Sequence, residues 1–301
     1  MHTWVLGLDL RERSQGALHF AKWVMARHRA APADLLHLLA VHVVDAGAMR
    51  RALRGEDFDR LLDERRRAAL AAVQATLGEK ADVLVVAGDR ADERLAAAAV
   101  LHGAEGLVVG RQAKRNEERL VALGQVARRI VRRLPVPTWI VPPDWTEADA
   151  TDGPILVAVD GREDSLAALR YAARMGIELG RKVRAAFVVE LPEPWGEPYA
   201  NLPRLLAEAR DRFIEEARPQ VQEFLAGAGY GDMPFDVEEG PVVQRLLECA
   251  DRCDATCIVA GSRRLSLVER FFSSSVGSSL AAASTRPVAL VAPDSAASAA
   301  P

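Results

Sequence analysis

The chain has 301 residues, which is the length of two domains of about 150 residues rather than one. Half of these residues are hydrophobic, so each of two domains could bury a core of its own. The formal net charge of -3 excludes the strongly basic class of nucleic-acid-binding proteins. We therefore expect no nucleic acid among its partners.

The first residues do not have the character of a secretion signal. They lack a basic start and reach the carboxylate of Asp9 before a long apolar region forms. Elsewhere no uncharged run is both long and apolar enough to cross a bilayer. We therefore expect a cytoplasmic protein with no membrane as partner.

Strands and helices alternate along the first half of the chain. A buried strand is expected at 5–9, with a helix after it. A second strand at 40–45 precedes a long amphipathic helix at 57–77. Three further strands are expected at 82–86, 106–109 and 137–142.

The second half repeats this order. Its first strand is expected at 155–160, and a second at 185–190 precedes an amphipathic segment at 201–226. Pro219 should begin a helical turn or kink the helix within that segment. Three further strands are expected at 235–237, 257–260 and 287–293.

The two halves match position by position. Asp160 follows Asp9 by 151 positions, and Gly261 follows Gly110 by the same interval. This self-similarity indicates a tandem repeat of one unit. The same interval separates two serines that are predicted to cap, or nearly cap, the first helix of each copy, Ser14 and Ser165.

The alternation predicts an α/β architecture of two tandem, doubly wound, parallel-sheet domains. Ligands of such sheets bind at the carboxyl ends of strands, where Asp9, Asp160, Gly110 and Gly261 stand. Each glycine opens a loop that leads to a helix, and the unpaired N–H groups of a helix start suit an anion such as phosphate.

Turn-forming residues and composition set the expected boundaries. The first domain is predicted at 1–143 and the second at 155–293. Residues 144–154 are rich in turn formers and are predicted to be the linker. The Ala- and Ser-rich tail, 294–301, is expected to be disordered.

The fifth strand of each copy is apolar and flanked by prolines. Such a strand is an edge that needs covering. We expect the two strands to pair antiparallel with each other, or with another chain. The first arrangement makes an intramolecular pseudo-dimer, which could associate again as a homodimer.

Several of these features together resemble the universal stress protein family. They are the strands that end in aspartate, the His-Val-Val-Asp run at 42–45, the strand-glycine loops and the proline-flanked last strands. Two tandem copies cover nearly the whole chain. The resemblance implies Rossmann-like domains, each with a five-stranded parallel sheet. In one branch of the family it also implies ATP, held by Gly, two residues, Gly, nine residues, then Gly and Ser or Thr.

Both copies depart from that pattern. In the second, Gly261 is kept, Arg264 replaces the next glycine, and Ser274-Ser275 stands for the final pair. An arginine at 264 either blocks the approach of phosphate or pairs with it. In the first copy Ala113 replaces the glycine, the spacing is one residue longer, and the final pair is Gly124-Gln125.

The resemblance carries the nucleotide contacts onto two sets of residues. In the second domain, the favoured site, the set is Asp160, Val188, Ala260, Gly261, Arg264, Ser274, Ser275 and Val276. In the first domain, the weaker site, it is Asp9, Val43, Val109, Gly110, Gly124 and Val126.

Plainer interpretations stay open for several of these residues. Asp9 and Asp160 could simply accept backbone hydrogen bonds at a strand end, and the serines at 273–275 could be a helix cap. His42, inside a strand, is more typical of a satisfied core histidine than of a ligand. The charged stretch 111–119 is predicted to be solvated surface.

The three cysteines stand close together as Cys249, Cys253 and Cys257. Four-residue steps would place the first two on one helix face, whereas the third belongs to a strand-like run. The spacing is not that of a CxxC pair, and no histidine is nearby in the sequence. Small buried side chains are the favoured interpretation, with metal or redox chemistry as the alternative, and no metal site is predicted.

No catalytic motif of a nucleotide-hydrolysing, metallopeptidase or serine-hydrolase type occurs, so an enzyme is the weaker class. The resemblance implies a stress-response binding or regulatory module, with ATP and Mg²⁺ as the candidate ligand of the second domain and an unidentified protein partner. The alternatives are a nucleotide-free scaffold with occluded pockets, for which Arg264→Gly should gain ATP affinity, and a slow ATPase.

Overall fold

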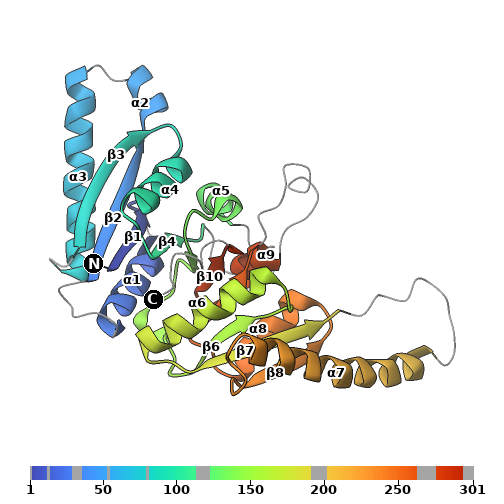
Figure 1. Ribbon diagram of the computed structural model, residues 1–301. Helices are drawn as coiled ribbons and strands as arrows, with labels where there is room; N and C mark the ends of the chain where they lie inside the picture. Colours follow the sequence, from blue (N-terminus) through green and yellow to red (C-terminus); the bar gives the residue numbers. More distant parts are fainter. Residues whose placement is uncertain are drawn as a thin grey trace.

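A computed structural model provides the structure of the chain (Figure 1). It describes residues 2–11, 14–28, 36–52, 55–78, 81–112, 123–190, 202–262 and 276–293. The predicted disordered tail lies outside these residues.

The first half alternates strands with helices, as its apolar runs predict. Its elements are β1 (His2–Leu8), α1 (Gln15–Arg27), β2 (Leu36–Asp45), α2 (Ala46–Ala52), α3 (Gly55–Leu77), β3 (Ala81–Gly88), α4 (Ala91–Leu101), β4 (Gly106–Gly110), α5 (Gln125–Arg133) and β5 (Thr138–Val141).

The second half repeats the same order after a short 3-10 turn, η3 (Glu147–Asp149). Its elements are β6 (Ile155–Ala158), α6 (Glu163–Leu179), β7 (Val183–Val189), α7 (Leu202–Gly227), β8 (Phe235–Glu239), α8 (Val242–Arg252), β9 (Cys257–Gly261), α9 (Val276–Ala283) and β10 (Val288–Val291).

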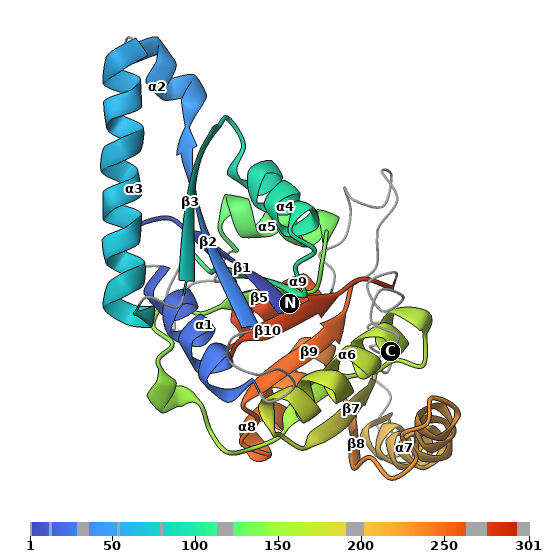
Figure 2. The same cartoon turned by 60° about the vertical axis from the view of Figure 1, so that its left-hand side comes forward.

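The strands form one ten-stranded sheet in the order β3-β2-β1-β4-β5-β10-β9-β6-β7-β8. Each half is a parallel sheet with the strand order of a doubly wound domain, which confirms the predicted fold class. The halves join where β5 and β10 pair antiparallel, with Trp139 opposite Ala289. The proline-flanked strands therefore cover each other's edges, and the two lobes stand on either side of this seam (Figures 1 and 2).

Helices cover both faces of the sheet, and alternate side chains of each strand serve the two faces. On β1, Trp4, Leu6 and Leu8 belong to the core cluster beneath α1, α3, α6 and α7. Val5 belongs to the other cluster, beneath α4, α5, α8 and α9. Both clusters run through the two halves, so the repeats share their cores.

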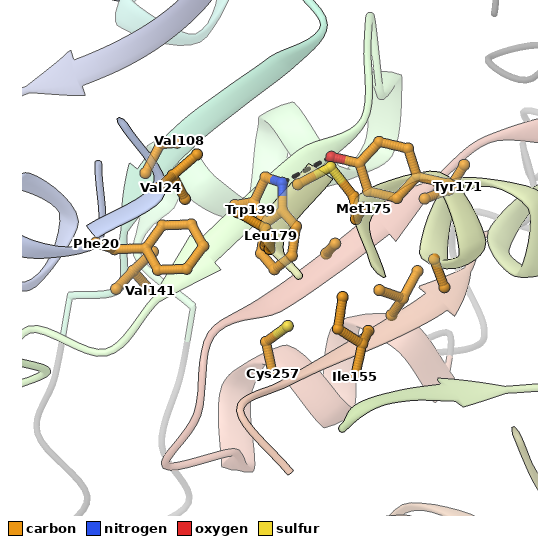
Figure 3. Packing of buried hydrophobic residues seen from close by; sticks show 14 of the residues in the cluster. Phe20, Val24, Val108, Trp139, Val141, Ile155, Tyr171, Met175, Leu179 and Cys257 are labelled. Atoms are coloured by element: carbon orange, nitrogen blue, oxygen red, sulfur yellow. Dashed lines mark hydrogen bonds between the residues drawn. The ribbon is translucent and has the colours of Figure 1, made fainter. Parts of the chain in front are cut away.

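Aromatic side chains fill the first cluster at the seam between the halves. Trp139 of β5 packs against Phe20 of α1, with ring centroids 5.0 Å apart. Its indole Nε1–H donates a hydrogen bond to the hydroxyl of Tyr171 in α6, at 2.8 Å (Figure 3). A buried polar contact therefore ties the two domains together inside an otherwise apolar core.

The beginning of the predicted linker packs on the first domain. Trp145 is only 2% exposed, and its ring meets Phe20 and Trp23 edge-on at 5.4 and 6.1 Å. Gly16 of α1 lies against the residues just before the linker, and its N–H donates a hydrogen bond to Pro143 O at 3.1 Å. A side chain at position 16 would place its Cβ 1.9 Å from Pro142 O.

Three local features differ from or refine the predictions. The helix α2 was not expected, since its short sequence carries no clear apolar period. Pro219 lies inside α7, which continues past it to Gly227. In the part of the chain that the structure describes, no helix combines the length and the apolar character needed to span a bilayer.

Candidate functional site

A cavity of about 700 Å³ opens at the carboxyl ends of β1, β2 and β4, beside the beginning of α5. This is the switch point of the first domain, where β1 lies between β2 and β4. Its wall contains all six residues of the predicted first-domain site: Asp9, Val43, Val109, Gly110, Gly124 and Val126.

Apolar side chains form one side of the cavity. Val41 and Val43 contribute from β2, Val109 from β4 and Leu95 from α4. Gly7 of β1 makes this packing possible, because a Cβ there would lie 3.1 Å from both the Leu95 and Val109 side chains. An apolar wall of this kind suits the flat face of a nucleobase.

The other side of the cavity is the N-terminus of α5. Gly124 is the N-cap, and the first N–H groups of the helix, at Gln125, Val126 and Ala127, have no acceptor within the helix. A Cβ at position 124 would come 2.8 Å from the Cβ of Gln112. Glycine therefore lets the loop after β4 close onto the helix start, where N–H groups and the helix dipole attract anions.

Asp9 is engaged in local hydrogen bonds at the mouth of the cavity. Its Oδ1 accepts from the N–H of Arg11 at 2.9 Å and from the hydroxyl of Ser14 at 2.7 Å. Asp9 therefore does what the plainer interpretation expects, since its carboxylate accepts hydrogen bonds at the end of a strand. Ser14 occupies the N-cap position of α1 as predicted, but its hydroxyl bonds Asp9 instead of the helix.

Leu10 adopts a backbone conformation that residues other than glycine rarely adopt. Its φ is 58°, in the left-handed region, and the equivalent Gly161 of the second copy has φ 76°. A non-glycine residue in this region carries about 1 kcal/mol or more of strain. Leu10 lines the cavity, so the strained turn lies at the site itself.

His42 is a satisfied core histidine, as expected, although it also lines the cavity. It is 8% exposed, and its Nδ1–H donates to Leu8 O at 2.8 Å. Burial lowers the pKa of His42 below its ordinary value, and the positive charge of Arg65 acts in the same direction. The ring is therefore neutral at physiological pH.

Among the cavity-wall residues that the sequence did not predict, three come from a part of the chain that was assigned no role in the site: Met49, Leu61 and Arg65. They come from α2 and α3, which follow the second strand. The amphipathic period of residues 57–77 predicts a helix but does not say that its first turns reach over the strand ends. Arg65 and Arg11 bring positive charge to a site whose carboxylates are Asp9 and Asp45.

The sequence comparisons fit this arrangement. Two copies of the universal stress protein family match the chain, over residues 1–142 and 153–292. The chain belongs to the universal stress protein family. No curated protein matches it in a comparison of sequences.

Solved structures share the fold of this tandem universal stress protein over its whole length. A universal stress protein from Archaeoglobus fulgidus has a TM-score of 0.68 and 19% identity, with 97% of this chain and 98% of that one covered. A protein of unknown function from Pseudomonas aeruginosa has a TM-score of 0.63 and 16% identity, with 99% and 95% covered. At these identities the likeness extends to the fold alone.

In the second domain of this universal stress protein, the described site residues reach the equivalent edge of the sheet. Asp160 follows β6, Val188 lies in β7, Ala260 and Gly261 end β9, and Val276 begins α9. The carboxylate Oδ1 of Asp160 accepts from the N–H of Arg162 at 3.0 Å, as Asp9 does from Arg11. The remaining predicted contacts lie outside the described residues: Arg264, Ser274 and Ser275.

The prediction of solvated surface is wrong for Arg111, which is only 1% exposed. Its N–H donates to Val141 O at 2.8 Å, just as Ser262 N–H of the second copy donates to Val291 O at 2.9 Å. The side chain, however, enters the second domain, where carbonyl groups accept from it. Residues 113–119 of the same stretch lie outside the described part.

The cysteine residues are free thiols, and two of them are buried as predicted, Cys249 in α8 and Cys257 in β9. Cys253 directly follows α8 as its C-cap and is half-buried. The Cys249 thiol donates to Asp236 Oδ2 at 3.4 Å. A two-point contact with the Arg184 guanidinium lowers the pKa of that carboxyl.

Proposed function

We propose that this universal stress protein is a stress-response binding module that takes an adenine nucleotide, with Mg²⁺, in the cavity of its first domain. One observation carries the proposal. The cavity, of about 700 Å³, lies at the switch point of the sheet and is lined by all six residues onto which the family resemblance places the nucleotide.

The two sides of the cavity suit the two ends of such a ligand. The apolar wall of Val41, Val43 and Val109 offers packing for the base. The N–H groups at the start of α5 offer hydrogen bonds to phosphate, and Arg11 and Arg65 supply compensating charge. The cavity also argues against the alternative in which side chains fill the pocket of the first domain.

The second domain is proposed to hold the equivalent site, around Asp160, Val188 and Gly261. There the phosphate contacts depend on Arg264 and the serines at 274 and 275. Ligand binding to one or both sites would favour one arrangement of the loops and of the surfaces they present, which is a regulatory mechanism by population shift. A cytoplasmic location, association as a homodimer and the identity of the protein partner are further predictions.

A matched pair of substitutions tests which domain binds. Val126 and Val276 occupy equivalent positions in the first turns of α5 and α9. Glutamate is favourable in the first turn of a helix, so Val126→Glu and Val276→Glu should both fold. Each nevertheless places a negative charge where the phosphates are expected.

Isothermal titration with ATP and Mg²⁺ is the measurement. We expect the wild-type protein to release or absorb heat on binding, and Val126→Glu to weaken the affinity at least about tenfold through charge repulsion. Loss of binding in Val276→Glu instead would assign the site to the second domain. No heat and no thermal shift at millimolar ATP would refute the proposal, and phosphate release in the same samples tests slow hydrolysis.

A further inference from the structure

A second polar cluster lies at the opposite end of β1 from the cavity, where the first domain meets α6 of the second. It contains His2 at the start of β1, His28 after α1, Glu105 before β4 and Glu178 in α6. Arg174, also of α6, contacts both carboxylates. The nucleotide proposal makes no use of these residues.

Three residues of this cluster, His2, His28 and Glu105, bring donor atoms together, and Glu178 lies beside His28. His2 Nδ1 lies 2.5 Å from Glu105 Oε1, and His28 Nε2 lies 3.4 Å from Glu178 Oε2. One ligand atom from each of His2, His28 and Glu105 falls within 4.8 Å of the others. Four ligands around a tetrahedral ion at about 2.0–2.2 Å stand about 3.3 Å apart. To bind an ion, His2 and Glu105 would therefore separate from their 2.5 Å contact, and Glu178 would move toward them.

Several polar atoms of the cluster lack hydrogen-bond partners among the described residues. The side chain of His28 is 0% exposed, yet neither ring nitrogen makes a hydrogen bond with a described residue, and Nε2 has only the 3.4 Å contact with Glu178. The Oε2 atom of Glu178, whose side chain is 5% exposed, has none either. Buried polar atoms are rarely left unsatisfied, so the neighbouring His28 Nε2 and Glu178 Oε2, which do not hydrogen-bond each other, indicate a missing partner.

Arg174 orients the carboxylates toward the histidines. Its Nη1 lies 3.4 Å from Glu105 Oε2 and 3.2 Å from Glu178 Oε1. The other oxygen of each carboxylate, Oε1 of Glu105 and Oε2 of Glu178, is the one that faces an imidazole. Fixing ligand carboxylates through their outer oxygens is what the surroundings of a metal site commonly do.

We propose that His2, His28, Glu105 and Glu178 form a binding site for a first-row divalent metal ion, with Zn²⁺ as the best match. Two imidazoles and two carboxylates are a donor set that zinc accepts in tetrahedral geometry. Imidazole donors disfavour Mg²⁺ and Ca²⁺, which prefer oxygen ligands. Two carboxylates against one guanidinium also leave a net negative charge for the ion to balance.

An ion pair between His28 and Glu178 is the simpler alternative. The 3.4 Å contact between His28 Nε2 and Glu178 Oε2 does not have hydrogen-bond geometry, and it leaves Nδ1 of the same buried ring unsatisfied. A metal ion satisfies the same atoms without a proton on the imidazole. The first domain supplies three ligands and the second supplies Glu178, so the ion would also fasten the two domains together.

Titration of the purified, metal-free full chain with Zn²⁺, and with Co²⁺ as a spectroscopic probe, tests the site. We expect one equivalent to bind, the visible absorption of tetrahedral Co²⁺ to appear, and the thermal midpoint to rise with Zn²⁺. His28→Gln and the isosteric Glu178→Gln should each weaken the affinity at least about tenfold. The matched control is His102→Gln, at an exposed position.

The thiols are the main competitor for these ions, so the titration is repeated with Cys253→Ser. Unchanged binding in that variant supports the proposed site, and loss of binding there overturns it. The proposal also fails if no metal binds, or if His28→Gln and Glu178→Gln both bind as the wild type does. Circular dichroism checks that each variant is folded. If His28→Gln does not fold, the metal affinity of Glu178→Gln alone decides whether the proposal holds.

Discussion

The guanidinium of Arg111 donates a hydrogen bond to the carbonyl oxygen of Ser284, 2.9 Å away in the other domain. The same Nη1 also contacts the carbonyl oxygen of Ala282. These groups lie at the end of α9, where the last carbonyls have no N–H donor within the helix and the helix dipole attracts a cation. Arg111 directly follows Gly110 of the cavity wall. Its side chain therefore joins the first-domain site to the C-terminal end of α9, the helix that starts at Val276 of the predicted second-domain site.

Replacing Arg111 should therefore destabilise the whole protein. Arg111→Met keeps much of the apolar stem but leaves the carbonyls of α9 without their charged donor. The expected cost is about 3 kcal/mol, because buried hydrogen bonds to a charged group are lost and the acceptors stay desolvated. Urea unfolding measures it. The control Arg132→Met, at an exposed position of α5, should change stability by less than about 0.5 kcal/mol, and equal effects of the two would contradict this role.

The bond between Trp139 and Tyr171 makes a second prediction. Tyr171→Phe removes the acceptor of the indole N–H and leaves that donor buried, which should cost about 1–3 kcal/mol. Urea unfolding followed by tryptophan fluorescence gives the value. Trp139→Phe combined with Tyr171→Phe should cost less than the sum of the single changes. Additive costs would mean that the bond contributes nothing.

The sequence was sufficient to predict the architecture because each copy repeats the same local signals. Apolar runs that end in Asp9 or Asp160 mark the same strand twice, and the proline-flanked runs mark the strands that join at the seam. Strand and helix periods depend on neighbours in the chain, so they can be recognised without a structure. Gly110 and Gly124 were found through the family resemblance, although the spacing before Gly124 is one residue longer than in the family pattern.

Contacts between distant segments could not be predicted in the same way. Arg111 stands in a run of charged residues that is typical of surface, and its burial depends on carbonyls of α9 far along the chain. His28 and Glu178 come together only because α6 of the second domain packs against α1 of the first. A local sequence pattern contains no information on such a meeting.

Cys253 is expected to be the reactive thiol of the three. The neighbouring Cys249 side chain and the positive charge of Arg184 lower the pKa of Cys253, whereas burial raises the pKa of Cys257 to about 12. The thiolate is the nucleophile, so iodoacetamide at neutral pH should modify Cys253 at least about tenfold faster than Cys257. Peptide mass spectrometry after timed quenching measures both rates. Preferential labelling of Cys257 would contradict the assignment.

His42 should make the stability of the protein depend on pH. Because burial lowers its pKa below the ordinary value of 6.5, the unfolded chain binds a proton more readily than the folded one. The contribution of neutral His42 to the free energy of unfolding is therefore fully present above pH 6.5, and it is lost as the pH falls from there toward the pKa of the folded state. His28, whose pKa is also lowered, contributes in the same direction, so only a comparison with a variant isolates His42.

Phe187 occupies the equivalent place in the second copy, which makes His42→Phe the matched substitution. The free energy of unfolding of this variant should fall less steeply than that of the wild type between pH 7 and pH 5. Parallel curves from denaturant titrations at each pH would show that His42 does not carry the effect.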